Sequence, residues 1–518
     1  MTDANSSSRV PNRLLGRGLV AMGLAVMLAL AGCTSGGGGG GGSTPSETPP
    51  EHTLSVAATL EPASLDPWHN TAASIPQVLL YNVYETLVKI DSEGAIKPLL
   101  AQRWTLSEDR LTYTFILNPA AKFASGKPVD AAAVVANIER MKNDPKLIET
   151  LRAQLAVVAS AKVVDDGQVA ITLTRPSLMW LYDMSSTLGI ILDPSFTGDL
   201  SNTTAGSGPY VVKAHDKGQD IVLAKSDSYW GTPARYDDVT FRYISDPNAQ
   251  NAAMLSGDLD VISNLQAPDS LPQFADTSRF TVTKGTTNGE VVLGLNHKSK
   301  PLANLKVRQA LTMAIDRKAL MDTVWNGEGT LIGSMAVPTD PWYEDLSGVN
   351  PYDPAKAKQL LAEAGYAKGL TLRMRVPVVP YAVKSAQFVA SQLRDIGVTV
   401  KVEELDFSRW LSEVFTNGDY DMTIVAHVEA RDLGKFANPN YYWHYGSPEF
   451  AELYQQADEA TDDQAVEKMK LAVRYLANDC AAIWLFALPN LVVTKNTVTG
   501  VPANATTLSF DLTTIASR

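Results

Sequence analysis

The sequence has very few cysteines for its length, with only Cys33 and Cys480 among 518 residues. Cys480 lies in an apolar run and is expected to behave as a small buried hydrophobic residue. Cys33 follows an apolar N-terminal segment, far away in the chain. These two residues exclude a disulfide framework, so the fold must depend on apolar cores, for which a hydrophobic content of 45% is sufficient.

Positive charge is also scarce. Lysine and arginine total 44 residues against 56 aspartates and glutamates, which gives a formal net charge of −12. An acidic chain has little electrostatic attraction for nucleic acid or for an anionic lipid surface. We therefore expect no nucleic-acid partner.

The common catalytic and metal-binding motifs are absent from the sequence. It contains no Gly-x-Ser-x-Gly elbow, Ser-x-x-Lys, P-loop, His-Glu-x-x-His or Cys-x-x-Cys. The six histidines show no spacing typical of metal ligands. The sequence predicts neither an enzyme nor a resident metal or cofactor, although hydrolysis of peptides by a set of residues outside these motifs stays open.

The sequence has one long apolar run, Leu19–Leu30, which is too short to span a bilayer. Three arginines precede it, as in a secretory signal peptide, which we assign to residues 1–32. Leu30-Ala31-Gly32-Cys33 resembles a bacterial lipobox, which predicts a diacylglyceryl group on Cys33 and a membrane anchor. The alternative is an ordinary cleaved signal with a chance cysteine. Residues 33–50, rich in glycine, serine and proline, are predicted to be a flexible tether.

The remaining chain mixes strand and helix patterns. Capping residues or Asp-Pro pairs predict helix starts, and alternation of apolar residues predicts strands. A strand, a short helix and a strand between Val239 and Ile262 predict a βαβ unit, which favours a parallel sheet. The other predicted strands are 54–58, 112–117, 169–174, 291–295, 370–376, 398–402 and 421–426, and the other predicted helices are 75–87, 304–315, 353–365 and 383–396, with helices beginning at Asp130 and Asp406.

Several short motifs, in this order over most of the chain, resemble the extracytoplasmic solute-binding proteins that serve ABC importers of oligopeptides, dipeptides and nickel chelates, known as solute-binding protein family 5. The motifs are Glu61-Pro-Ala-Ser-Leu-Asp-Pro67, Tyr84-Glu85-Thr-Leu-Val88, Pro98-Leu-Leu-Ala-Gln-Arg-Trp104, Phe123-Ala-Ser-Gly126-Lys-Pro-Val-Asp130, Gly208-Pro-Tyr210, Arg308-Gln-Ala-Leu-Thr-Met-Ala-Ile-Asp316 and Gln359-Leu-Leu-Ala-Glu-Ala-Gly365.

The resemblance implies an α/β fold, a two-lobed periplasmic-binding-protein clamp of type II-like topology. The first lobe is expected to comprise residues 51–292 and 491–518, with an extra subdomain at about 98–200. The second lobe is expected to comprise residues 293–490. A ligand is buried between the lobes by hinge closure and is then delivered to a membrane permease. We expect the protein to be a monomer.

The resemblance also implies where the ligand binds. In peptide binders of the family an aspartate meets the ligand's amine and cationic groups meet its carboxylate; here Asp432 and Arg431 occupy the corresponding stretch, Ala426–Tyr445. Asp432 can instead cap a turn or pair with a neighbouring cation on the surface. The other candidate ligand contacts are Trp443, Tyr441, Trp68, Asn70 and Asn296, each of which can alternatively be a core or turn residue.

Three functions thus remain open on this fold. The first is capture of di- to oligopeptides for an importer. The second is capture of a nickel chelate or another small solute, because His427 and His444 flank Asp432. The third is a scaffold or sensor that uses the same clamp. A nickel binder is expected to lose its ligand to chelators, whereas a peptide binder is not.

Overall fold

The computed structural model describes residues 52–518, which all fall in one compact unit, Pro50–Arg518. The predicted signal peptide, Cys33 and the predicted tether lie outside the described residues. Among residues 52–518, no helix combines the length and the apolar character needed to cross a membrane.

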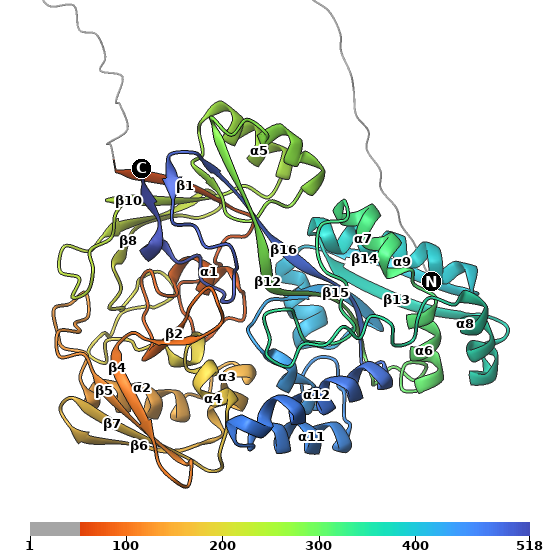
Figure 1. Ribbon diagram of the computed structural model, residues 1–518, viewed down its shortest axis with the longest axis horizontal. Coiled ribbons are helices and arrows are strands. Elements are labelled where there is room, and N and C mark those ends of the chain that lie inside the picture. Colours follow the sequence, from red (N-terminus) through yellow and green to blue (C-terminus); the bar gives the residue numbers. More distant parts are fainter. Residues whose placement is uncertain (1–51) are drawn as a thin grey trace, which may run out of the picture. The chain divides into compact units, whose positions relative to one another are not determined.

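One ten-stranded sheet organises the molecule, in the order β14-β13-β15-β12-β16-β11-β1-β10-β9-β8. Two long antiparallel strands near its middle, β12 and β16, run side by side and connect its two parts (Figure 1). We call the part from β8 to β11 the first lobe and the part from β13 to β15 the second lobe. The strands are β1 (Thr53–Ala58), β8 (Tyr210–Asp216), β9 (Asp220–Lys225), β10 (Asp238–Tyr243), β11 (Val261–Ile262), β12 (Phe280–Leu295), β13 (Leu370–Pro377), β14 (Val398–Leu405), β15 (Met422–His427) and β16 (Ile483–Lys495).

The predicted βαβ unit is confirmed. Strands β10 and β11 both pair in parallel with β1, and helix α5 (Pro247–Ser256) connects them. The Asp246 carboxylate accepts hydrogen bonds from the first backbone amides of α5, and Gly257 ends the helix at a φ of 94°. The local sequence therefore sets both ends of this helix.

The first lobe carries a second, four-stranded sheet in the order β4-β5-β7-β6. Helix α2 (Ala131–Asn143) is capped by Asp130, where a helix start was predicted, and it packs on strands β6 and β7, burying Val134, Ile138 and Met141. The remaining elements of this region are β2 (Val88–Ile90), β3 (Ile96–Pro98), β4 (Ala101–Leu106), β5 (Thr112–Leu117), β6 (Val158–Asp165), β7 (Gln168–Leu173), α3 (Glu149–Leu155) and α4 (Met179–Asp183).

The predicted helix over 75–87 is wrong in its second half. Helix α1 covers only Ser74–Leu79, and Tyr81 then adopts a φ of 65°. The helix ends there because Asn82 forms hydrogen bonds with residues far away in the sequence. Its side-chain amide donates to the carbonyl of Phe510, and its backbone carbonyl accepts from Tyr210 N. The apolar residues that follow are buried on all sides and not along one helical face.

Glu85, in one of the motifs noted above, connects this segment to a distant part of the first lobe. Its buried carboxylate accepts hydrogen bonds from Ser207 Oγ at 2.7 Å, Tyr229 Oη at 2.8 Å and Trp230 Nε1 at 3.0 Å. Nearby, a Cβ on Gly208 would lie 2.5 Å from the carbonyl oxygen of Asn82, so only glycine fits there. Two of the motifs therefore meet to form a structural joint.

This joint predicts a pH dependence of stability. Burial raises the pKa of Glu85 to about 7 against an ordinary 4.5, even though its three donors oppose the rise. The folded state therefore holds the proton more tightly than the unfolded state, and the free energy of unfolding falls as pH rises from about 4.5 through 7. The expected loss from this group is about 3 kcal/mol. Urea unfolding of wild type and Glu85→Gln at pH 5 and pH 8 tests this.

In that comparison, Glu85→Gln should lose about 3 kcal/mol less than wild type between the two pH values. Glu108→Gln, at an exposed glutamate of the same lobe, is the control and should behave as wild type. Equal pH slopes for Glu85→Gln and wild type would refute the role given to this carboxyl.

The helices of the second lobe follow local start signals. Asn304 and Asp353 each cap a helix, as predicted, and α9 packs on β13, β14 and β15. Helices α7, α11 and α12 were not predicted from the sequence. The helices are α6 (Leu305–Met313), α7 (Arg317–Trp325), α8 (Pro354–Leu361), α9 (Pro380–Asp395), α10 (Phe407–Arg409), α11 (Pro448–Asp458) and α12 (Asp462–Asp479).

The C-terminal tail returns to the first lobe. Phe510 N donates to the carbonyl of Gln77, and Asp511 forms an ion pair of 3.0 Å with Lys89. Leu512 and Ile515 belong to the same buried cluster as Val56. The residue numbers that we predicted as lobe boundaries stay a prediction.

Candidate functional site

A cavity of about 500 Å³ lies between the two lobes. Its first-lobe wall comes from residues 67–90 and from residues 148–188, around α3 and α4. Its second-lobe wall comes from residues 407–455, which include the end of β15, the turn after it and α11. This volume lies within the range of about 300–1,000 Å³ typical of small-molecule sites.

Asp432 begins the short 3-10 helix Asp432–Ala437 in the wall of this cavity. It is buried, and its Oδ1 has no hydrogen-bond partner among residues 52–518. Its Oδ2 lies 3.2 Å from Lys435 Nζ and 3.5 Å from His427 Nδ1. Burial opposes ionisation, but the positive charge of Lys435 and the contact with His427 lower the pKa of Asp432 below its ordinary value. Asp432 is therefore a buried carboxylate with one free acceptor oxygen.

Lys435 is shared between two carboxylates. Besides Asp432 it forms a close ion pair with Glu429, on the turn after β15. Although burial disfavours its charge, these acids raise the pKa of Lys435 well above its ordinary value. The group of Glu429, Lys435 and Asp432 thus holds one cation between two carboxylates, a net charge of −1 at neutral pH.

Arg431 also lines the cavity, in a left-handed backbone conformation with a φ of 57°. Its guanidinium lies over the ring of Tyr182, with Cζ 3.5 Å from the ring centroid, and 5.2 Å from that of Trp342. Such cation–π contacts hold the planar group in place without neutralising it. Because Tyr182 belongs to the first lobe, Arg431 also links the two walls.

Of the other residues predicted to contact ligand, the structure places two in the cavity wall. Tyr441 and Asn70 line the cavity, from the second and the first lobe respectively. The side chain of Asn70 also accepts a hydrogen bond of 2.8 Å from Ala72 N, which orients its amide.

The other three predicted contacts lie outside the cavity wall, each for a structural reason. Trp443 is 1% exposed and stacks on Phe436 with ring centroids 4.1 Å apart. Trp68 is fully buried, with the guanidinium of Arg140 5.3 Å from its ring centroid. The amide of Asn296 donates to two carbonyls, those of Gly418 and Tyr420, and so joins the end of β12 to the segment before β15.

Our sequence analysis missed the polar residues that join the two lobes. Asp458, at the end of α11, accepts hydrogen bonds from Arg175 Nη1 at 2.7 Å, Ser177 Oγ at 2.9 Å and Met179 N at 2.9 Å. Its own carbonyl accepts from Leu178 N. All four donors belong to residues 175–179 of the first lobe. The Ser447-Pro448 pair that begins α11 is the sequence signal that would have placed Asp458 on a helix.

Asp458 is expected to slow the reopening of the cavity. Asp458→Ala removes the acceptor of three donors, so a bound ligand should dissociate about 10-fold faster, with a smaller change in the association rate. Stopped-flow fluorescence of the tryptophans near the cavity measures both rates. Glu452→Ala, on the exposed face of the same helix, is the matched control. A dissociation rate within twofold of wild type would contradict this role.

Asp183, at the end of α4, is a second acidic residue of the cavity that the sequence did not reveal. Its Oδ1 accepts a hydrogen bond of 2.7 Å from Gln154 Nε2. Burial, together with the negative charges of Asp458 and Glu429, raises the pKa of Asp183 to about 8. This carboxyl is therefore mainly neutral at pH 7.

The histidine of the cavity wall, His427, is in contact with protein side chains through both ring nitrogens. His427 lines the cavity, but its Nε2 lies 2.9 Å from Tyr442 Oη and its Nδ1 faces Asp432. Burial lowers its pKa below the ordinary value, which favours the neutral ring. Within residues 52–518, no group of three or more histidine, cysteine or acidic side chains is arranged to hold a metal ion.

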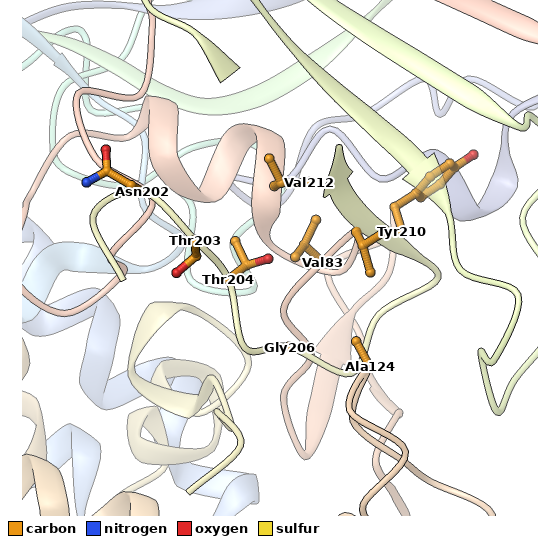
Figure 2. A pocket seen from close by; sticks show the side chains of 9 residues that line it. Val83, Ala124, Asn202, Thr203, Thr204, Gly206, Tyr210 and Val212 are labelled. Carbon is orange, nitrogen blue, oxygen red and sulfur yellow. The ribbon is translucent and has the colours of Figure 1, made fainter. Parts of the chain in front are cut away.

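A smaller cavity of about 210 Å³ lies within the first lobe (Figure 2). Figure 2 shows Val83, Thr204 and Tyr210 around it. Its lining contains no carboxylate, ammonium or guanidinium group, and it shares no residue with the larger cavity. Since no charged group lines it, the larger cavity is the better candidate for ligand binding.

Two lobes joined by long strands, with a charged and aromatic cavity enclosed between them, define a solute-binding clamp. The chain belongs to the bacterial extracellular solute-binding proteins, family 5, whose middle-region model matches residues 95–462. The family that the motifs indicated, and the α/β clamp that it implies, are thereby confirmed.

Curated relatives differ in the ligands that their names state. The chain is 28% identical to the glutathione-binding protein GsiB of Salmonella paratyphi A over 362 residues, which is 68% of this chain and 70% of the relative. It is 28% identical to the dipeptide-binding protein of Escherichia coli K12 over 378 residues, covering 66% and 68%. It is also 28% identical to the nickel-binding periplasmic protein of the same strain over 344 residues, covering 62% and 65%.

Solved structures share the fold. The binding protein AgaA of A. tumefaciens R10, in complex with agropinic acid, has a TM-score of 0.82 at 25% identity and covers 90% of this chain and 99% of its own. The binding protein DppA of Helicobacter pylori, in complex with a peptide, has a TM-score of 0.80 at 22% identity, covering 90% and 98%. Because its sequence identity is only 22%, the comparison with DppA shows a shared fold and nothing more.

Proposed function

We propose that this protein is the substrate-binding lipoprotein of an ABC importer and that it captures short peptides between its lobes. The observation that carries the proposal is Asp432, a buried carboxylate with a free acceptor oxygen in the wall of the cavity between the lobes. A buried carboxylate of this kind matches the ammonium group of a peptide's amino terminus, because charge-assisted hydrogen bonds repay the desolvation of both groups.

Arg431 is the proposed partner of the peptide's carboxylate. Its guanidinium is fixed over Tyr182, so a bound anion needs to order few additional side-chain torsions. Tyr441 and Asn70 are proposed further contacts, since both line the cavity. Trp443, Trp68 and Asn296 are not part of the proposed site.

The cavity volume favours small peptides over long ones. About 500 Å³ suits a ligand of two or three amino acids. Two of the relatives are named for ligands of this size, a dipeptide and glutathione. We infer a binding function without catalysis, because the relatives are named as binding proteins.

The location of the protein follows from the N-terminal sequence. We propose that residues 1–32 are removed, that Cys33 carries the lipid and that residues 33–50 tether the clamp to the outer face of the cell membrane. A tethered clamp captures solute close to the permease that receives it. We propose monomeric clamps with lobe boundaries at 51–292 plus 491–518 and 293–490.

Calorimetric titration tests the function. The protein is titrated with alanyl-alanine, with glutathione and with the nickel complex of histidine, each with and without EDTA. The proposal expects saturable binding of the peptide ligands that EDTA leaves unchanged. Binding of the nickel complex alone, abolished by the chelator, would replace the peptide assignment with the alternative of metal uptake.

A further inference from the structure

We propose that Asp183 receives a second cationic group of the ligand, so that this protein prefers short peptides with a basic side chain. This inference rests on the proposed function, since it assumes that a peptide occupies the larger cavity. It adds a specificity determinant on the first lobe, opposite the wall that carries Asp432.

The geometry leaves Asp183 free to bind a cation. Its side chain lines the cavity and is partly accessible from it. The neutral amide of Gln154 holds Oδ1 at 2.7 Å and thereby orients the carboxyl group. No lysine, arginine or histidine of the described part of the chain forms an ion pair with Asp183.

The other charges of the cavity already have partners. Arg175 pairs with Asp458 at 2.7 Å, and Lys435 lies between Glu429 and Asp432. The last cation of the wall, Arg431, lies over aromatic rings. Among the acids of this cavity wall, Asp183 is thus the one that forms no ion pair with a described residue, and a cationic ligand group would supply its partner.

Asp183 and Asp432 can act on the same ligand. Both side chains line the same cavity, Asp183 from the first lobe and Asp432 from the second. One peptide can then place its amino terminus at Asp432 and a basic side chain at Asp183.

The test compares two dipeptides that differ in charge and hardly in shape, alanyl-arginine and alanyl-citrulline. Their dissociation constants are measured by titration calorimetry at pH 7.5 with residues 50–518, which form one compact unit. Wild type should bind alanyl-arginine about 10-fold or more tightly than alanyl-citrulline. Asp183→Asn keeps the size of the side chain and should bind the two dipeptides with about equal affinity.

Controls separate this inference from the proposed function. Asp269→Asn, at an exposed aspartate of the first lobe, should keep the preference for alanyl-arginine. Alanyl-alanine should bind equally well to wild type and to Asp183→Asn. The outcomes that would contradict the proposal also differ. Equal affinity of wild type for alanyl-arginine and alanyl-citrulline would overturn the role of Asp183 and leave the proposed function intact. A loss of alanyl-alanine binding in Asp183→Asn would instead make Asp183 the partner of the amino terminus. Failure of all peptides to bind wild type would overturn both.

The pH dependence of the preference for alanyl-arginine over alanyl-citrulline gives a second test. The charged and titratable groups that act on Asp183 are Asp458 and Glu429, which favour its neutral form, and Lys435, which opposes them, with Tyr454 close by. Because the pKa of Asp183 is about 8 in the empty cavity, the preference for arginine over citrulline should grow between pH 6 and pH 8.5. In Asp183→Asn it should not change with pH, and a flat profile in wild type would contradict the assignment.

Discussion

Asp432→Asn lowers the affinity for alanyl-alanine by about 30-fold to several thousand-fold, because the substitution removes the negative charge that meets the ligand's ammonium group. The large effect is expected since the carboxylate is buried and its Oδ1 has no other partner among the described residues. Lys435 keeps its ion pair with Glu429, so the substitution leaves no unpaired lysine in the wall. Calorimetric titration at pH 7.5 measures the change.

Two controls sharpen this result. Asp395→Asn, at an exposed aspartate that ends α9, should bind alanyl-alanine as wild type does. N-acetylated alanyl-alanine lacks the cation, so it should bind wild type weakly and Asp432→Asn no more weakly. An affinity of Asp432→Asn for alanyl-alanine within threefold of wild type would show that the amino terminus binds elsewhere.

Trp443→Ala lowers the free energy of unfolding by about 3–5 kcal/mol, the usual cost of removing a large aromatic side chain from a core. Trp443 is almost completely buried, stacks on Phe436 and also packs against His427, with ring centroids 4.7 Å apart. Its indole also lies so close to Gly294 of β12 that a Cβ there would be 2.7 Å from Nε1. Urea unfolding at pH 7 measures the loss.

Binding measurements decide whether Trp443 acts as core or as ligand contact. Trp443→Phe restores most of the packing and should recover both most of the stability and the affinity for alanyl-alanine. Tyr352→Ala, at a tyrosine that is 50% exposed, should change the free energy of unfolding little. If Trp443→Ala kept the stability of wild type but lost binding of alanyl-alanine, Trp443 would be a ligand contact and not a core residue.

The sequence predicted those parts of the fold that local signals control. Asp130, Asp246 and Asn304 each cap a helix where the pattern placed it, and Gly257 ends one. The helix over 75–87 was wrong because the distant tail, through Phe510, determines the conformation of Asn82. Contacts over such separations leave no local pattern to read.

The candidate site was predictable only in part. The family resemblance pointed to Asp432 and Arg431, and both line the cavity. Residue type could not separate Tyr441, which lines the cavity, from its neighbour Trp443, which lies in the core, since both are buried aromatics. Asp183 could not be recognised because its position in the cavity arises only when α4 packs near α11 and the turn after β15.

Native mass spectrometry tests the central claim, the capture of short peptides, most directly. Residues 50–518 are purified from cells without denaturation, and the mass of any retained ligand is compared between wild type and Asp432→Asn. The account predicts a set of masses that match short peptides in wild type and their loss in the variant. A single metal-containing or sugar-like mass, retained in both proteins, would contradict it.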